Sequence, residues 1–170
     1  MVLESALARW SAAVGDEYVV TTPSVLDAAS RATYATNHRP VAVVRPGTIA
    51  EVQACVRVAA GSGVGLWPLS TGKNWGYGSR VPGADGATIL DLSRLDRIVH
   101  YDPDMGYVTV EPGVTQSQLH AFLVEQGGTH WLDATGSTRR SPARSAPSRR
   151  NWPRGGLAAD PDRRGRDADG

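Results

Sequence analysis

Apolar residues recur at helical spacing near the start of the chain, and shorter apolar runs follow further on. Spacing from Leu3 to Val14 predicts a first helix, which we expect to end at Gly15. Val19 and Val20 indicate an extended stretch, and Ser24 with Asp27 indicates the start of a second, short helix. These residues form a predicted N-terminal helical segment over 1–37.

A β-α-β unit is predicted next. The β-branched run at 41–44 is typical of a buried strand. Thr48 and Glu51 have the spacing of a capping box, and the helix that it begins should end near Gly61. A second strand is expected at 66–69, and a unit of this kind favours parallel pairing. The expected buried stripe of the helix consists of Ile49, Val52, Cys55, Val56 and Ala59.

Short strands dominate the following part of the chain. Runs at 88–91, 98–101 and 107–111 are expected to form an antiparallel meander. Thr115 and Gln118 predict another capping box, with a helix that reaches the glycines at 127–128. The fold class is therefore α+β, a small β-α-β layer followed by short antiparallel strands. An all-helical arrangement, or a helix through 66–78, would contradict it.

The segment 70–78, STGKNWGYG, carries the strongest chemical signal. Glycines allow backbone N–H groups to approach a ligand closely, and this turn also holds the chain's only lysine, Lys73. A phosphate or pyrophosphate cradle is one interpretation, and a glycine-rich surface turn is the other. The spacing fits neither the P-loop nor the dinucleotide fingerprint G-x-G-x-x-G.

Several pieces in a fixed order, from Arg39 to Ser137, resemble the flavin-binding half of the vanillyl-alcohol oxidase and para-cresol methylhydroxylase flavoproteins. Taken together, these pieces are stronger evidence than any single motif. They imply a PCMH-type FAD-binding domain over 38–137. The matching pieces are VAVVRPGT at 41–48, EVQ to Ala60 at 51–60, WPLSTGKNWGYG at 67–78, ILDLS at 89–93 and YVTVEPGV at 107–114.

This resemblance implies FAD as the cofactor, with backbone N–H groups of the glycine loop on its pyrophosphate. It also implies hydride transfer from para-substituted phenols or aryl alcohols to flavin. A phenolic substrate, and in some members a cytochrome partner, would belong to the full-length relative. The expected cofactor-binding residues are Ser70, Thr71, Gly72, Lys73, Asn74, Gly76, Tyr77, Gly78, Pro112, Gly113, Thr135, Gly136 and Ser137. No catalytic residue carries over, because the family's catalytic residues lie beyond position 137; whether this chain is itself an enzyme stays open.

Residues 138–170 break the pattern. They hold 9 Arg and 4 Asp with one large aliphatic residue, Leu157, whereas residues 1–137 hold 9 Lys and Arg against 13 Asp and Glu. So few apolar side chains predict a disordered tail. A reading-frame error in a truncated gene would produce this composition. The alternative is a noncatalytic fragment whose basic tail binds nucleic acid, which the four acids disfavour.

The remaining features narrow the class of protein. Cys55 is the single cysteine, so an internal disulfide or a cysteine metal cluster is excluded, and no metal is expected. No apolar run is long enough to span a membrane, and residues 1–5 do not resemble a secretory signal. The sequence therefore predicts a cytoplasmic location.

Overall fold

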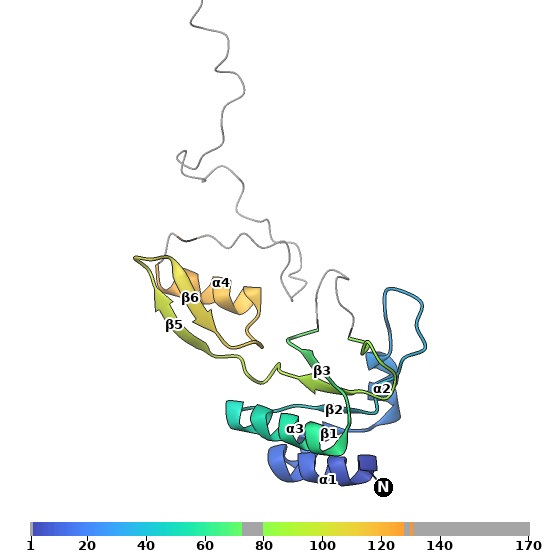
Figure 1. Ribbon diagram of the computed structural model, residues 1–170. Coiled ribbons are helices and arrows are strands. Elements are labelled where there is room, and N and C mark those ends of the chain that lie inside the picture. Colours follow the sequence, from blue (N-terminus) through green and yellow to red (C-terminus); the bar gives the residue numbers. More distant parts are fainter. Residues whose placement is uncertain (1, 73–79, 128–129, 131–170) are drawn as a thin grey trace, which may run out of the picture. The chain divides into compact units, whose positions relative to one another are not determined.

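The computed structural model describes residues 2–72, 80–127 and 130 of the chain (Figure 1). Its architecture is α+β, as predicted. The helices are α1 (Val2–Val14), α2 (Pro23–Ala29), α3 (Ile49–Ser62) and α4 (Gln116–Glu125), with a 3-10 turn η1 (Asp16–Tyr18). The strands are β1 (Val19–Val20), β2 (Ala42–Val44), β3 (Leu66–Leu69), β4 (Thr88–Asp91), β5 (Ile98–Asp102) and β6 (Tyr107–Val110).

The main sheet has the strand order β1-β2-β4-β3. Strand β4 pairs in parallel with both β2 and β3, while β1 is antiparallel to β2. The prediction that 88–91 belongs to an antiparallel meander was therefore wrong. Every residue of β4 is buried, which is typical of a central strand covered on both faces. Of the three strands predicted for the meander, β5 and β6 do pair antiparallel with each other.

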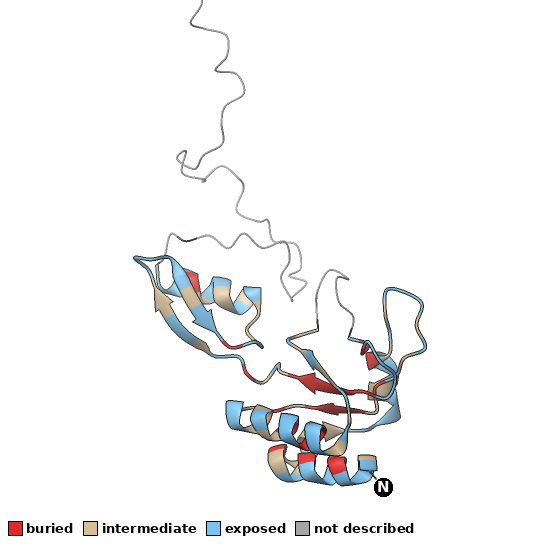
Figure 2. Ribbon diagram, viewed as in Figure 1, coloured by how far each residue is buried: buried red, intermediate tan, exposed pale blue. Residues whose placement is uncertain are grey.

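Two apolar clusters cover the two faces of this sheet. Trp10 of α1 and Cys55 of α3 pack with Val44 and Leu90 on one face, and Ala29 of α2 packs with Val43 and Ile89 on the other. Figure 2 shows this burial concentrated along β2 and β4. The carboxyl end of β4 is thereby held in a rigid sheet.

Helix α3 follows the predicted β-α-β order, with two differences in detail. Thr48 accepts from Glu51 N as expected, but the Glu51 carboxylate accepts from Gly47 N, so the reciprocal bond goes one residue earlier. Ile49 and Val56 are exposed. The buried face keeps Cys55 and Ala59 of the predicted stripe and adds Val58, because this face packs against α1 and the sheet.

The β5–β6 hairpin packs beside α4 (Figure 1). Tyr101 lies edge-on against Phe122 of α4, with ring centroids 5.7 Å apart. The predicted capping box at the start of α4 is complete, because Thr115 and Gln118 exchange both bonds. A two-stranded hairpin needs such packing to persist in water. Among the described residues, no helix is long and apolar enough to cross a membrane.

Burial raises the pKa of the Cys55 thiol to about 11, with a further contribution from the negative charge of Glu51. The raised pKa stabilises the folded chain below the pKa of an exposed thiol, about 8.5, and that contribution is lost as the pH rises towards 11. At about pH 8, a disulfide reagent should leave Cys55 unmodified in the folded chain and react fully in urea. The unfolding free energy should decrease at alkaline pH, in part because of this thiol. Cys55→Ala should remove the part of the decrease that the thiol causes. Rapid modification of the folded chain would contradict this burial.

Candidate functional site

The start of the predicted glycine loop follows directly from β3. Ser70 leaves the strand and its hydroxyl donates to the carbonyl oxygen of Pro112. Thr71 comes next, and Gly72 has a left-handed φ of 65°, which favours glycine. The structure thus brings two predicted groups together, residues 70–72 and residues 112–113. No helix forms over 66–72, in agreement with the prediction.

Gly113 makes the closest backbone approach at this site. A Cβ atom there would lie 2.7 Å from the carbonyl oxygens of Leu92, Ser93 and Leu95. The Gly113 N–H donates to Leu95 O over 2.7 Å. No side chain fits against three backbone oxygens, so this position requires glycine for space and not for a positive φ.

Arg97 and Glu111 form an ion pair beside the turn that contains Gly113, and we call this pair the clamp. The Glu111 carboxylate accepts from Arg97 Nη2 at 2.6 Å, from Arg97 Nε at 3.0 Å and from Arg97 N at 2.9 Å. The hydrogen bonds from Arg97 hold the pKa of Glu111 below its usual value. Glu111 is therefore negatively charged at neutral pH, and the positive charge of Arg97 balances it.

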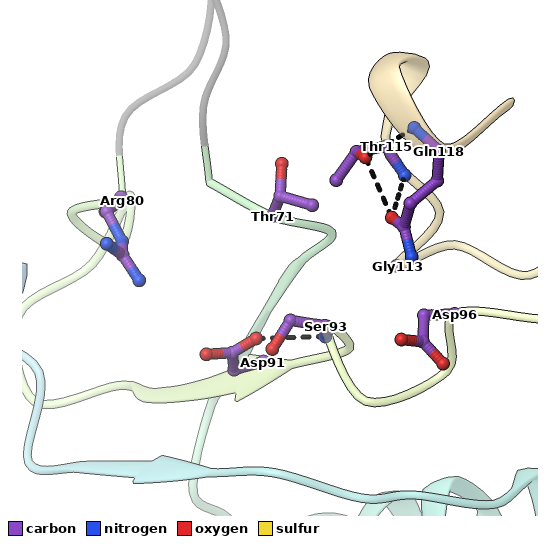
Figure 3. A pocket seen from close by; sticks show the side chains of 8 residues that line it. All are labelled: Thr71, Arg80, Asp91, Ser93, Asp96, Gly113, Thr115 and Gln118. Carbon is purple, nitrogen blue, oxygen red and sulfur yellow. Dashed lines mark hydrogen bonds between the residues drawn. The ribbon is translucent and has the colours of Figure 1, made fainter. Parts of the chain in front are cut away.

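A cavity of about 310 Å³ opens beside these residues (Figure 3). It lies where the loop after β3, the end of β4, the 112–115 turn and the start of α4 meet. This volume is at the lower end of the range for small-molecule pockets, so it suits one part of a large cofactor. Its lining residues are Thr71, Arg80, Asp91, Ser93, Asp96, Gly113, Thr115 and Gln118.

The charges around this cavity are mixed. Asp91 ends the central strand with its side chain only 9% exposed, and it lies 3.5 Å from Arg45 Nε. Its other oxygen accepts from Ser93 N at 3.0 Å, which fixes the turn after β4. The Arg80 side chain lies against Gly72. A Cβ atom on that glycine would be only 2.9 Å from Arg80 Nε. A positive group and a buried carboxylate therefore line the same cavity.

This set of groups can recognise an anionic ligand that also carries hydroxyl groups. The Arg80 guanidinium and the backbone N–H groups of a glycine turn are of the kind that suits phosphate oxygens. Carboxylates and the hydroxyls of Thr71 and Ser93 suit sugar or polyol hydroxyls, which donate as well as accept. FAD offers both kinds of group. Among the described residues, no cluster of His, Cys, Asp and Glu could hold a metal ion.

Part of the predicted site lies outside the described residues. Of the expected cofactor-binding set, the structure describes Ser70, Thr71, Gly72, Pro112 and Gly113. The others that lie outside are Lys73, Asn74, Gly76, Tyr77, Gly78, Thr135, Gly136 and Ser137. The disordered-tail prediction for 138–170 lies outside them too.

Sequence reasoning missed several residues that line the cavity. Asp91 ends a buried strand and Ser93 follows it, both inside the ILDLS piece, so the end of a parallel strand was an available signal. The spacing of Thr115 and Gln118 predicts a helix cap and does not indicate a cavity. Arg80 and Asp96 had no signal in the sequence, because only the folded loops bring them to the cavity.

Comparisons with known proteins identify the family of the chain. The family described as FAD binding domain matches residues 40–148, so the chain belongs to that family. Within it, the chain is of the p-cresol methylhydroxylase type, and its cofactor is FAD. The matched range extends past Ser137, and the predicted domain boundary at that residue stays a prediction.

Curated relatives include two proteins of different named activity. The chain is 52% identical over 136 residues to 1'-carboxy-chondrochloren decarboxylase of Chondromyces crocatus, covering 80% of this chain and 25% of the relative. It is 41% identical over 88 residues to the 4-cresol dehydrogenase [hydroxylating] flavoprotein subunit of Pseudomonas putida, covering 52% of this chain and 17% of the relative. The chain therefore spans a quarter or less of the length of these relatives.

Solved structures give the same fold. Substrate-bound p-cresol methylhydroxylase superposes with a TM-score of 0.71 at 33% identity, over 74% of this chain and 25% of that one. A 4-ethylphenol oxidase from Gulosibacter chungangensis, in complex with isoeugenol, gives a TM-score of 0.71 at 29% identity. That match covers 78% of this chain and 26% of the oxidase.

The substitution Gly113→Ala tests the close approach at the cavity. Because the added methyl group meets three carbonyl oxygens, the 112–114 turn must move, and the chain should lose about 1–3 kcal/mol of unfolding free energy. Gly61→Ala is the matched control, since its Cβ would meet only Arg9 Nη1 at 3.7 Å and it lies within α3. The control should be neutral or slightly stabilising in urea unfolding. Equal stability of both variants would contradict the close approach of Gly113 to these three carbonyl oxygens.

Proposed function

We propose that this chain supplies the FAD-binding part of a flavin-dependent oxidoreductase that acts on para-substituted phenols or aryl alcohols. The observation that carries the proposal is the cavity where Thr71, Gly113 and Arg80 meet, on a chain of the FAD binding domain family. Supporting it are the relatives named for 4-cresol and 4-ethylphenol. When bound, FAD would supply hydride acceptance from the substrate.

The residues of this chain bind and orient the cofactor in the proposal. Backbone N–H groups at the start of the glycine loop and the Arg80 guanidinium hold phosphate oxygens. Gly113 lines the cavity at the 112–115 turn. The Asp91 carboxylate accepts from hydroxyls of the cofactor, and the Ser93 hydroxyl accepts or donates. The rest of the predicted set, Lys73, Asn74, Gly76, Tyr77, Gly78, Thr135, Gly136 and Ser137, is proposed to complete the site.

Decarboxylation of a carboxylated small molecule is a second candidate reaction. It is favoured by one observation, the 52% identity to a protein named as a decarboxylase. The two candidates share the FAD site and differ in the substrate. Product analysis of a full-length relative of this chain would separate them, since only the second releases carbon dioxide from a carboxylated substrate.

Partners and location are also proposals. A partner subunit for the full-length relative is supported by a relative whose name designates a flavoprotein subunit. The family resemblance makes a cytochrome our proposal for that partner. Nucleic-acid binding by the basic tail stays the alternative to an oxidoreductase, and strong DNA binding that weakens steeply with salt would support it. A cytoplasmic location stays a prediction.

Loss of the glycine at position 72 should weaken FAD binding. Titration of the 170-residue chain should quench flavin fluorescence, and ADP should compete because it carries the pyrophosphate. Gly72→Val should weaken FAD binding at least about tenfold, because valine is strained at positive φ and displaces Arg80. Gly63→Val is the control, with nearly the same φ of 66° and open space around its Cβ. Equal FAD affinity of both variants would refute the site.

The chain by itself should not turn over substrate. No catalytic residue of the phenol-oxidising reaction is assigned to it, so we expect no oxidation of vanillyl alcohol or a 4-alkylphenol above the FAD blank. The measurement is oxygen uptake and reduction of an artificial electron acceptor, with added FAD. Sustained turnover by the purified chain would show that catalytic groups lie within these 170 residues.

A further inference from the structure

We propose that Glu111 is a positioning residue of the FAD site, which acts by fixing the Pro112–Gly113 turn through its clamp with Arg97. The inference rests on the proposed FAD site. It adds a role for two residues that neither line the cavity nor belong to the glycine loop.

The clamp is built on backbone as well as side chains. Arg97 N donates to the Glu111 carboxylate at 2.9 Å, and Glu111 N donates to Arg97 O at 2.9 Å. The guanidinium then closes on the other carboxylate oxygen through Nε and Nη2. Arg97 directly precedes β5 and Glu111 directly follows β6, so the clamp closes the open end of the hairpin.

Burial is unequal within the clamp. The Glu111 side chain is 9% exposed, while that of Arg97 is 76% exposed. An ordinary exposed ion pair contributes little to stability. Here the carboxylate is nearly enclosed, and it also satisfies a backbone N–H group. Loss of the Glu111 charge therefore disturbs the backbone at 97 and 111, whereas loss of the guanidinium leaves the backbone bonds in place.

The backbone at 111–114 transmits this constraint to the cavity. Gly113 N donates to Leu95 O at 2.7 Å, and Val114 N donates to Glu111 O at 3.1 Å. Between these bonds lies Pro112, whose carbonyl oxygen accepts from the Ser70 hydroxyl. Glu111 thus sets where Pro112 and Gly113 stand against the first residue of the glycine loop.

The test compares Glu111→Gln with Glu125→Gln in the 170-residue chain. Glutamine keeps the shape at position 111 but loses the charge, and its amide group faces the Arg97 donors. Glu125 ends α4 and is exposed, so the control makes the same chemical change away from the turn. FAD affinity is measured by flavin fluorescence, and amide hydrogen exchange is measured without flavin.

We expect Glu111→Gln to weaken FAD binding about tenfold, as loss of a charged hydrogen bond implies, and to speed exchange at Gly113. Exchange in α3 and β4 should stay unchanged, which a general loss of stability would not allow. Arg97→Gln should have a smaller effect, and the double variant should bind FAD no more weakly than Glu111→Gln alone, because both act through one clamp.

Two results would overturn the inference. Unchanged FAD affinity and unchanged Gly113 exchange in Glu111→Gln, with FAD bound by the unmodified chain, would reject the positioning role and leave the proposed function intact. Faster exchange throughout α3 and β4 would make Glu111 a residue of general stability. An unmodified chain that does not bind FAD would instead reject the proposed function, and this inference with it.

Discussion

The site depends on one close backbone contact, the approach of Gly113 to the carbonyl oxygens of the 92–95 turn. That turn follows β4, a central strand of the mixed main sheet, while Gly113 follows the antiparallel hairpin. The contact therefore joins the two sheets of the described chain at the point where the cavity opens. Any side chain at position 113 would separate them, and the loop residues would lose their shared position.

Burial of β4 gives this contact its rigidity. With apolar clusters on both faces of the strand, the carboxyl end of β4 has little freedom, and Asp91 is held there by Arg45 and by the Ser93 amide. Ligands of parallel sheets bind beyond the carboxyl ends of the strands. The cavity at this end, with its hydroxyls, carboxylates and Arg80, combines that placement with groups that suit the phosphates and hydroxyls of FAD.

Local patterns in the sequence predicted most elements but not all of their partners. The helix from Val2 to Val14, the strands at 42–44 and 66–69, and the cap at Thr115 follow from spacing and capping chemistry, which act over a few residues. The strand at 88–91 was predicted in its place along the chain but given the wrong neighbours. An apolar run reports burial, and it does not report which strands lie beside it.

The same limit applies to the site. Residues 70–72 and 112–113 were predicted from glycine spacing and from the family resemblance, and the structure brings them together. Arg80 and Asp96 were not predicted, since only the folding of their two loops brings each of them to the cavity that both line (Figure 3). The clamp of Arg97 and Glu111 escaped prediction for the same reason, because their pairing requires the hairpin register.

The most direct measurement is a map of backbone amide shifts in the isotope-labelled chain during titration with FAD and, separately, with riboflavin. If the account is correct, FAD shifts the amides of Thr71, Gly72, Gly113 and Thr115, and riboflavin, which lacks the phosphates, leaves those of Thr71 and Gly72 in place. The amides of α1 and α3 should not move with either ligand. FAD shifts confined to α1 and α3, or no shifts at Gly72 and Gly113 at saturating FAD, would contradict the account.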